Sequence, residues 1–489
     1  MILIKKPSSI PIATILLSPR TAAAYTSGYG ILHGRVFNSR CAGGTRAKRQ
    51  AAFSSPTTSK PAKEVPLTPL SILPLSTIIR SIALKSILSS RYLLPPCLAI
   101  TSFIANTSLR LFSPESNPLV HILLKSVLYK HFCAGETLPE VRKTTDSLRS
   151  IGYSGVVLAY AKETAWDEKT SDSSTIPDFI SKASKEEINR WTKGTLDTIA
   201  LTVPGDFIAL KLTGAGPHAL SLLSRSLPPS TEIQEAISKI CNTARQHNVR
   251  LLLDAEHSNI QKSIHDWSIG WMEQYNTSNN GRAVIYNTYQ AYLKETPLLL
   301  TEHLTIAGRK NFILGVKLVR GAYLDSEPRH IIHETKEETD DAYDKIAANL
   351  VQRKYWAPKP CQSAEAEFPD ICVMLATHNL ISIRKVQAIR KLRKERGDKN
   401  VDLVYAQLQG MADEIGCELI LSRNVTLEKE GTDLTQAYVY LVWGTVGECM
   451  KYLLRRADEN RDALQRKDGK VEEWKELKRR LGIKYLEKY

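Results

Sequence analysis

The stretch Ile313-Leu-Gly-Val-Lys-Leu-Val319, followed directly by Arg320, predicts the fold of this 489-residue chain. It is a short, nearly continuous apolar run that ends in polar residues, which is the pattern of a strand buried on both faces of a parallel sheet. Similar runs recur along the chain and alternate with stretches of helical periodicity. The predicted strands are residues 155–160, 207–212, 249–254, 283–287, 313–319, 371–377, 402–407 and 438–443.

Eight strands that alternate with helices favour a closed barrel. Eight such units over about 300 residues fit an α/β fold of the (β/α)8 type better than an open doubly wound sheet. Polar residues gather at the C-terminal ends of the strands, and in a barrel these ends meet at one mouth, where active sites lie. No GxGxxG follows the first strand, and no P-loop or HExxH occurs. A dinucleotide cofactor is therefore not expected to bind in the Rossmann manner.

The formal charge of +15 is concentrated at the N-terminus. Residues 1–63 hold ten Lys or Arg and no Asp or Glu, which leaves 56 basic and 51 acidic residues, or +5, for the rest of the chain. An acid-free segment rich in Arg, Ser and Ala is typical of a mitochondrial presequence, and the alternative is a disordered basic tail. The small charge of the remainder, with aromatic residues at 7% overall, argues against a nucleic-acid partner.

Three further regions follow the presequence. Residues 64–150 predict a helical N-terminal region whose short helices pack on the barrel or touch a membrane surface. Its apolar run is shorter than the roughly 20 residues that span a bilayer, and Pro95 and Pro96 are expected to break any helix there. Residues 151–465 form the predicted barrel, and 466–489 a charged, solvated helical tail. The eight cysteines contain no CxxC pair, so reduced thiols are expected.

The strand-end residues predict a cationic site. Adjacent arginines at 455 and 456 point about 100° apart on a helix, so one is expected to bind substrate while the other turns toward a cofactor; ordinary surface charge is the alternative. His378 at a strand end is compatible with a cofactor, a metal or simple packing, and metal is the weakest option without a second ligand at suitable spacing. Gly321 would let a flavin or phosphate approach the backbone closely.

Six short motifs occur in a fixed order between residues 130 and 463. They are Leu253-Asp-Ala-Glu256, Thr288-Tyr-Gln290, Lys317-Leu-Val-Arg-Gly-Ala-Tyr323, Ala376-Thr-His-Asn379, Gln407-Leu-Gln-Gly-Met411 and Tyr452-Leu-Leu-Arg-Arg-Ala-Asp-Glu-Asn460. This series resembles the motifs of proline dehydrogenases, and Phe132-Cys-Ala-Gly-Glu136 is similar to the eukaryotic type. The resemblance implies a barrel that uses FAD to oxidise L-proline to Δ1-pyrroline-5-carboxylate by hydride transfer.

The resemblance also implies a role for each residue of the site. Lys211, Arg455 and Arg456 would hold the proline carboxylate, and Asp254 would orient Lys211. The residues expected around the pyrrolidine ring are Tyr323, Leu408 and Tyr440. The residues expected to hold FAD are Gln290, Lys317, Arg320, Gly321, Thr377, His378, Asn379, Gln407 and Glu459, the last of which would alternatively anchor an arginine.

Two departures from the family pattern affect the site. The basic residues of the fifth-strand motif, Lys317 and Arg320, stand in the reverse of the common bacterial order, so either is a candidate to face flavin N5. The family pattern Tyr-x-Pro-Tyr-Gly before the last helix is here Tyr440-Leu-Val-Trp-Gly444, which leaves the role of Tyr440 open.

The resemblance implies that electrons pass to a membrane quinone, with the protein in the mitochondrial matrix in peripheral contact with the inner membrane. Other readings remain. One is a related flavin barrel that acts on hydroxyproline or another cyclic amine. A reading of a different class is an inactive barrel that serves as a binding module, which flavin content would distinguish from an enzyme.

Overall fold

The structure is a computed structural model, and it describes most of the chain beyond the N-terminal segment. The expected presequence over residues 1–63 lies outside the described residues, and so does the side chain of Glu459. The described residues are 68–90, 92–107, 109–161, 180–277, 281–324, 327–356, 367–427, 435–464 and 469–482.

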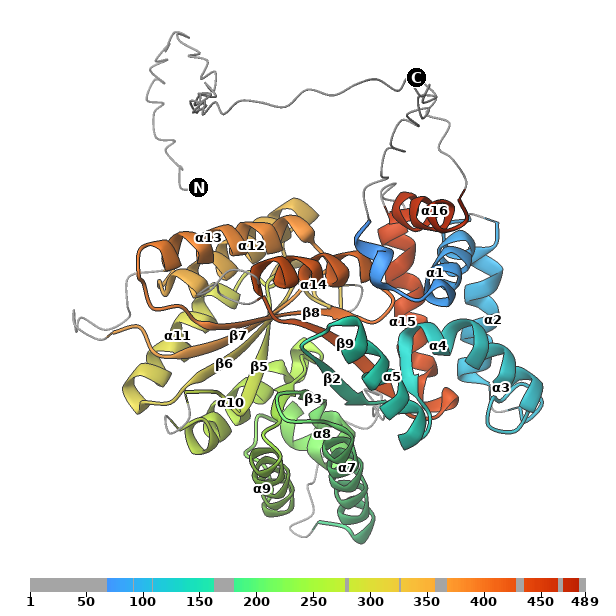
Figure 1. Cartoon of the computed structure of the whole chain (residues 1–489). Helices are drawn as coiled ribbons and strands as arrows, with labels where there is room; N and C mark the ends of the chain where they lie inside the picture. Colours follow the sequence, from blue (N-terminus) through green and yellow to red (C-terminus); the bar gives the residue numbers. More distant parts are fainter. Residues whose placement is uncertain are drawn as a thin grey trace, which may run out of the picture. The chain divides into compact units, whose positions relative to one another are not determined.

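Eight parallel strands, β2 to β9, form a closed barrel, because β9 pairs with both β8 and β2 (Figure 1). All eight predicted strands are confirmed, and every observed end lies within three residues of its predicted position. The strands are β2 (Gly155–Tyr160), β3 (Phe207–Leu210), β4 (Arg250–Leu253), β5 (Ile285–Gln290), β6 (Leu314–Val319), β7 (Ile371–Ala376), β8 (Asp402–Leu408) and β9 (Ala437–Trp443).

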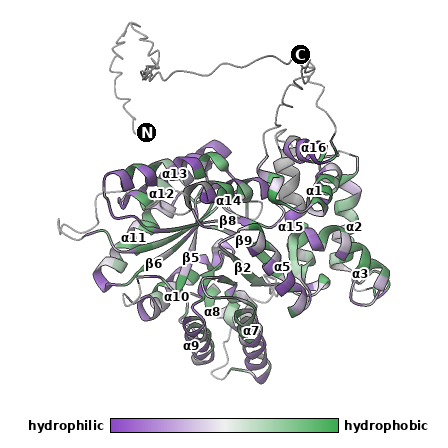
Figure 2. Ribbon diagram, viewed as in Figure 1, coloured by the Kyte–Doolittle hydropathy of each residue, from purple (hydrophilic) through white to green (hydrophobic). Residues whose placement is uncertain are grey.

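Helices follow the strands and cover the outside of the barrel. Alternate strand residues point outward into the helix layer or inward into the barrel, so both faces are apolar, and Figure 2 shows hydrophobic colour along the strands. The helices are α7 (Lys182–Leu201), α8 (Pro217–Ser224), α9 (Thr231–Gln246), α10 (Ser258–Tyr275), α11 (Thr296–Lys310), α12 (Lys336–Gln352), α13 (Leu380–Glu395), α14 (Asp413–Leu427) and α15 (Val446–Leu464).

A region of short helices precedes the barrel. The expected helix break at Pro95 and Pro96 is wrong: both prolines lie in the first turn of a helix, where the missing N–H donor costs nothing. One three-residue strand that the sequence did not predict pairs with β9. The elements of this region are α1 (Leu75–Leu88), α2 (Leu94–Asn106), α3 (Pro118–Leu124), a π-turn (Lys125–Tyr129), α4 (Lys130–Phe132), β1 (Cys133–Gly135) and α5 (Leu138–Ile151).

The last described helix, α16 (Gly469–Arg480), packs against α1. Its Glu473 accepts hydrogen bonds from Ser81, at 3.2 Å, and from Lys85. Its Glu476 is completely buried and accepts a bond from Thr68 at 2.7 Å. The expectation of a solvated tail is therefore wrong for this helix, because cations and hydroxyls compensate the burial of its acidic residues.

Two further findings concern membrane-spanning helices and disulfide bonds. Within the described residues, no helix is both long and apolar enough to cross a membrane. The described cysteines 97, 133, 241, 372, 417 and 449 are all unbridged, in agreement with the expected reduced thiols.

Candidate active site

A cavity of about 620 Å³ lies at the C-terminal ends of the barrel strands. Every predicted site residue whose side chain is described lines it, so the structure brings together fifteen of the sixteen. Lining residues outside the six motifs include Lys85, Tyr160, Lys336, Asp340 and Glu414. Basic side chains outnumber acidic ones in this lining, as predicted: Lys85, Lys211, Lys317, Lys336, Arg320, Arg455 and Arg456 against Asp254, Asp340 and Glu414.

Asp254, directly after β4, is the buried carboxylate of the cavity. Its Oδ1 accepts a hydrogen bond from Lys317 Nζ at 2.6 Å, and its Oδ2 accepts one from the Tyr440 hydroxyl at 2.7 Å. Burial opposes ionisation, but the charges of Lys317 and Lys211 and these hydrogen bonds outweigh it and lower the pKa of Asp254. Asp254 is therefore an ionised group that holds both Lys317 and Tyr440 in place.

Lys211, directly after β3, faces Tyr323. Lys211 Nζ lies 3.5 Å from the Tyr323 hydroxyl, which donates to the carbonyl of Ala255 at 3.3 Å. The ring of His257 lies 4.7 Å from the ring of Tyr323. These contacts place Lys211 and Tyr323 on the β4 side of the cavity, beside Asp254.

Lys317 and Arg320 point in different directions, although both line the cavity. The three guanidinium nitrogens of Arg320 donate to Asp340 at 2.6 Å, to Thr377 Oγ1 at 2.6 Å and to Ser382 Oγ at 2.9 Å. Arg320 is thus fixed toward α12 and α13, whereas Lys317 reaches across to Asp254.

Gly321 is required by packing. It adopts φ +154°, and a Cβ atom there would lie 2.5 Å from the ring of Tyr292. The sequence suggested that glycine lets a cofactor approach the backbone closely at this position. The contact with Tyr292 gives a second reason for glycine, which lies within the protein itself.

The two arginines of α15 both line the cavity, and the guanidinium of Arg456 lies 5.0 Å from the centre of the Tyr452 ring. Burial lowers the pKa of His257, and the charges of Lys211 and Arg455 contribute to this. The pKa of His378 is lowered as well: the ring is exposed to the cavity, but the surrounding protein keeps water from part of it, and the charges of Arg456 and Arg320 add to the effect. The positive charge of Arg455 therefore acts on His257, and that of Arg456 acts on His378.

The residues after β7 hold the loop after β8. His378 Nε2 accepts a hydrogen bond from the backbone N–H of Leu408 at 3.1 Å, which requires a neutral ring protonated at Nδ1. Thr377 Oγ1 accepts a bond from the N–H of Asn379 at 3.1 Å, and Asn379 caps α13. These side chains position the cavity wall, in addition to any role toward a cofactor.

Two glutamines present unpaired polar atoms to the cavity. Gln290 is 2% exposed, and neither its Oε1 nor its Nε2 has a hydrogen-bond partner. Gln407 Oε1 is likewise buried and unpaired. Orphaned amides are costly unless a ligand pairs with them. A flat heterocycle with adjacent donors and acceptors, such as the pyrimidine edge of a flavin, fits this donor and acceptor set.

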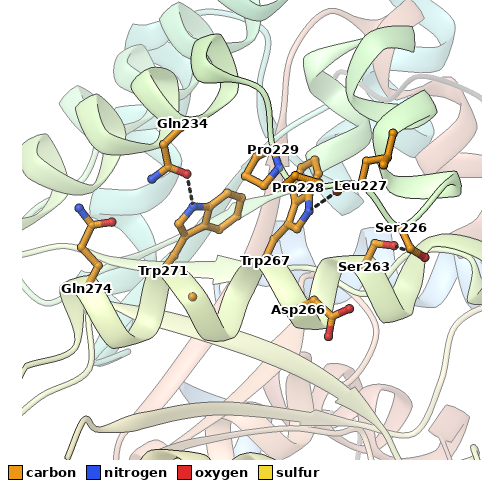
Figure 3. Close-up of a pocket in the computed structure, with 11 residues that line it drawn as sticks. Ser226, Leu227, Pro228, Pro229, Gln234, Ser263, Asp266, Trp267, Trp271 and Gln274 are labelled. Carbon is orange, nitrogen blue, oxygen red and sulfur yellow. Dashed lines mark hydrogen bonds between the residues drawn. The ribbon is translucent and has the colours of Figure 1, made fainter. Parts of the chain in front are cut away.

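A second cavity, of about 540 Å³, lies on the outer side of α10 (Figure 3). It is formed around Pro228, Pro229, Trp267 and Trp271, and it shares no lining residue with the strand-end cavity. Asp266 is the one charged residue in its lining. None of the residues of the six motifs lines this second cavity, whereas each motif contributes residues to the strand-end cavity.

Fold and site together define the class of protein: a (β/α)8-barrel enzyme whose cationic strand-end cavity suits an anionic substrate beside a planar polar cofactor. Residues 141–468 match the family model described as proline dehydrogenase. The chain belongs to the proline dehydrogenase family and is an oxidoreductase of that family, as the motifs predicted.

Relatives and solved structures agree with this family. The chain is 29% identical over 391 residues to "Probable proline dehydrogenase, mitochondrial" of Schizosaccharomyces pombe, which covers 69% of this chain and 76% of the relative. It is 26% identical over 379 residues to "Hydroxyproline dehydrogenase" of Mus musculus, covering 70% and 79%.

The crystal structure of proline utilization A (PutA) from Bdellovibrio bacteriovorus inactivated by N-propargylglycine superimposes with a TM-score of 0.56 at 14% identity. The match covers 80% of this chain and 41% of that protein, so this chain corresponds to less than half of it. The likeness confirms the barrel fold.

Proposed function

We propose that this chain oxidises L-proline to Δ1-pyrroline-5-carboxylate with FAD as its cofactor. Family membership supports proline oxidation. The observation that carries the finer proposal is the convergence, in one cavity, of cations that suit a carboxylate with the unpaired amides of Gln290 and Gln407. Loss of the amine proton and of a hydride from C5 of proline gives the imine product, and the bound flavin supplies the hydride acceptor.

Lys211 and Arg455 are the proposed partners of the proline carboxylate. Both line the cavity together with Tyr323, and the charges of both contribute to the lowered pKa of His257. Tyr323, Leu408 and Tyr440 would enclose the ring. A fixed carboxylate orients C5, so much of the catalysis is positioning.

Lys317 is the proposed residue nearest the flavin ring. It crosses the mouth of the barrel toward Asp254, and a cation there stabilises negative charge on a reduced flavin. Arg320, Thr377, His378 and Asn379 are proposed to hold other parts of FAD. Arg456 would face the cofactor, which modifies the expectation that both arginines bind proline.

In this proposal no side chain acts as a strong base for the amine proton of proline, because Asp254 already accepts hydrogen bonds from Lys317 and Tyr440. The enzyme would select the free amine form of proline. Activity should therefore rise with pH between about 6 and 9 as the amine deprotonates. A flat profile over that range would contradict this part of the proposal.

Mitochondrial location and electron transfer to a membrane quinone complete the proposal. The basic, acid-free segment 1–63 supports a mitochondrial location, and several relatives are named as mitochondrial proteins. A surface formed by α2, α3 and the segments next to them supports peripheral membrane contact, because large apolar side chains are exposed there. They include Tyr92, Leu93, Ile100, Phe103, Leu109, Leu111, Leu119, Ile122 and Leu123.

Hydroxyproline is the second candidate substrate, because two relatives are named hydroxyproline dehydrogenase. The cavity contains the hydroxyls of Tyr323 and Tyr440, which are able to bind or exclude a ring hydroxyl. The ratio of kcat/KM for L-proline to that for 4-hydroxyproline distinguishes the two proposals.

The decisive experiment is a visible absorbance spectrum of the purified chain before and after anaerobic L-proline. A flavin band near about 450 nm that bleaches with proline is the expected result. A band that proline leaves unchanged but hydroxyproline bleaches would favour the second candidate. Absence of flavin in folded protein supplied with FAD would refute the proposal and support a binding module.

A further inference from the structure

A row of buried polar side chains lies between α10 and the ends of β3, β4 and β5. We call it the α10 network. Four of its members, Glu256, Gln261, His265 and Asn287, are at most 6% exposed and do not line the cavity. Thr213, at 6% exposed, completes it. Buried polar groups of this kind are costly unless they are paired, so their arrangement calls for an explanation.

One end of the α10 network reaches the substrate side of the cavity. The Glu256 carboxylate accepts hydrogen bonds from the backbone N–H of Thr213, at 3.2 Å, and from the Thr213 hydroxyl. Thr213 lies two residues after Lys211, and Glu256 lies two residues after Asp254. Glu256 therefore ties together the two strand ends that present Lys211 and Asp254.

The other end of the α10 network reaches β5. Asn287 Nδ2 lies 2.6 Å from His265 Nδ1, and Asn287 Oδ1 accepts a bond from the N–H of Thr288 at 2.9 Å. Residues alternate across a strand, so Asn287 faces the helices while Thr288 and Gln290 face the cavity. His265 therefore fixes the strand that presents the unpaired amide of Gln290.

Gln261 lies between the two ends. Its Oε1 accepts a bond from the N–H of Glu256 at 2.8 Å, and its Nε2 lies 3.3 Å from His265 Nε2. Both amides thus turn N–H groups toward the His265 ring, and a neutral imidazole accepts from only one of them. The shorter contact identifies Asn287 as the donor. An imidazolium would accept from neither, and burial lowers the pKa of His265 to about 3.

Helix α10 is anchored on its outer side as well, as Figure 3 shows. Ser263 Oγ donates to the carbonyl of Leu223 at 2.6 Å, and the Trp267 indole donates to the carbonyl of Leu227 at 2.9 Å. The Trp271 indole donates to Gln234 Oε1 at 2.9 Å. A helix fixed from outside is a rigid support for the strands that the α10 network contacts.

We propose that Glu256 and His265 are positioning residues for opposite halves of the site. Glu256 acts through Thr213 on the carboxylate-binding Lys211, and His265 acts through Asn287 on the cofactor-binding Gln290. This inference rests on the proposed function of those two targets. We therefore expect changes at the Glu256 end of the α10 network to weaken proline binding, and changes at the His265 end to weaken flavin binding.

Variants of the full chain test each end. Thr213→Val removes the hydroxyl donor at constant shape, and His265→Gln moves the acceptor away from Asn287. Losing a hydrogen bond to a charged group, or an acceptor for a buried donor, is worth about tenfold in binding. Thr213→Val should raise the KM for proline by about that factor with an unchanged flavin Kd, and His265→Gln should do the reverse.

Two variants and one control complete the test. His265→Asn places an acceptor at the position of Nδ1, so it should restore flavin binding. Asn287→Ser breaks the same contact from the strand side, and it should reproduce the flavin-selective loss if His265→Gln does not fold. The control is Ser268→Ala: Ser268 is fully buried on α10 and donates to the carbonyl of His265 at 2.8 Å within the same helix, so neither constant should change.

The flavin Kd is measured by fluorescence on reconstitution, and proline binding by the perturbation of the flavin spectrum. Equal changes of both constants in Thr213→Val and His265→Gln, or no change in either, would overturn the proposal in favour of a purely structural network. Unsubstituted protein that binds no flavin, or whose flavin does not respond to proline, would instead refute the proposed function, and the positioning roles would fall with it.

Discussion

At the scale of single residues, the contact between Asp254 and Lys317 decides the charge balance of the cavity. The two side chains are 10% and 8% exposed and lie 2.6 Å apart. Lys317→Met would leave a buried carboxylate without its nearest cation, which costs about 3 kcal/mol of unfolding free energy. The double variant Lys317→Met with Asp254→Asn should recover most of that loss. Urea unfolding measures both values.

An exposed pair of the same length provides the control for that experiment. Lys310 and Glu273 also lie 2.6 Å apart, but their side chains are 50% and 43% exposed. Lys310→Met should change the unfolding free energy by less than about 1 kcal/mol, because water screens the interaction. Equal costs for Lys317→Met and Lys310→Met would mean that the Asp254 contact does not stabilise the fold.

Gly321 gives a second prediction at this scale. Gly321→Ala should destabilise the protein by about 2–4 kcal/mol, because the new methyl group meets the Tyr292 ring in a strained backbone conformation. Gly205→Ala is the matched control: its φ is +95°, but nothing lies within 4 Å of the new Cβ. Thermal unfolding of both variants separates the cost of the steric contact from the cost of the backbone conformation. Equal losses of stability in the two variants would show that the contact with Tyr292 does not matter.

At the scale of elements, two buried histidines fix β5 to its neighbouring helices. His265 of α10 contacts Asn287, and His303 of α11 lies 2.7 Å from the Tyr289 hydroxyl. Burial lowers the pKa of His265 to about 3 and that of His303 to about 4. In the unfolded chain a histidine has a pKa of about 6.5, so folding competes with protonation below that pH.

Stability should therefore be fully present above pH 6.5 and decrease as the pH falls toward 4. At pH 5 each of the two histidines should cost about 2 kcal/mol. Denaturant unfolding from pH 7.5 to 4.5 checks this, and His303→Asn should reduce the slope because it keeps an acceptor for Tyr289 but does not titrate. His330, which is exposed, provides the control variant His330→Asn. A slope identical in the His303 and His330 variants would contradict the assignment.

The elements also show which parts of the structure the sequence could predict. All eight barrel strands were predicted, because strands buried on both faces leave long apolar runs, and the strand-end position of Lys211 or Gln407 follows directly. Strand β1 was not predicted, since three residues carry no periodicity. The α10 network was also not predicted, because Gln261 and His265 lie one turn apart on a helix while their partners are Glu256, which follows β4, and Asn287 of β5.

At the scale of the whole molecule, the described chain joins its two ends through α1 and α16. Arg480 of α16 donates to the carbonyls of Ser71 and Leu73, at 3.0 and 2.8 Å, and Lys85 of α1 lines the strand-end cavity. The helical N-terminal region is thus part of the site, and the surface that it exposes on α2 and α3 lies on the same structural unit as the cavity. A membrane that binds this surface would bring a lipid-soluble electron acceptor to the protein.

This arrangement predicts binding to vesicles that contain acidic phospholipids. Leu119, Ile122 and Leu123 of α3 are 77%, 61% and 61% exposed. Replacing all three with Ser should lower the vesicle partition coefficient by about 100-fold or more, because each position loses more than about 1 kcal/mol of apolar burial in the membrane. The matched control replaces Leu298 and Ile381, which are 68% and 66% exposed on barrel helices α11 and α13, and should leave binding unchanged. Sedimentation with vesicles measures both.

Anionic lipid should strengthen binding, because residues 68–130 contain six basic residues and one acidic residue. Equal losses in the two variants would show that apolar exposure anywhere suffices, and no loss in the α3 variant would exclude this surface as the membrane contact.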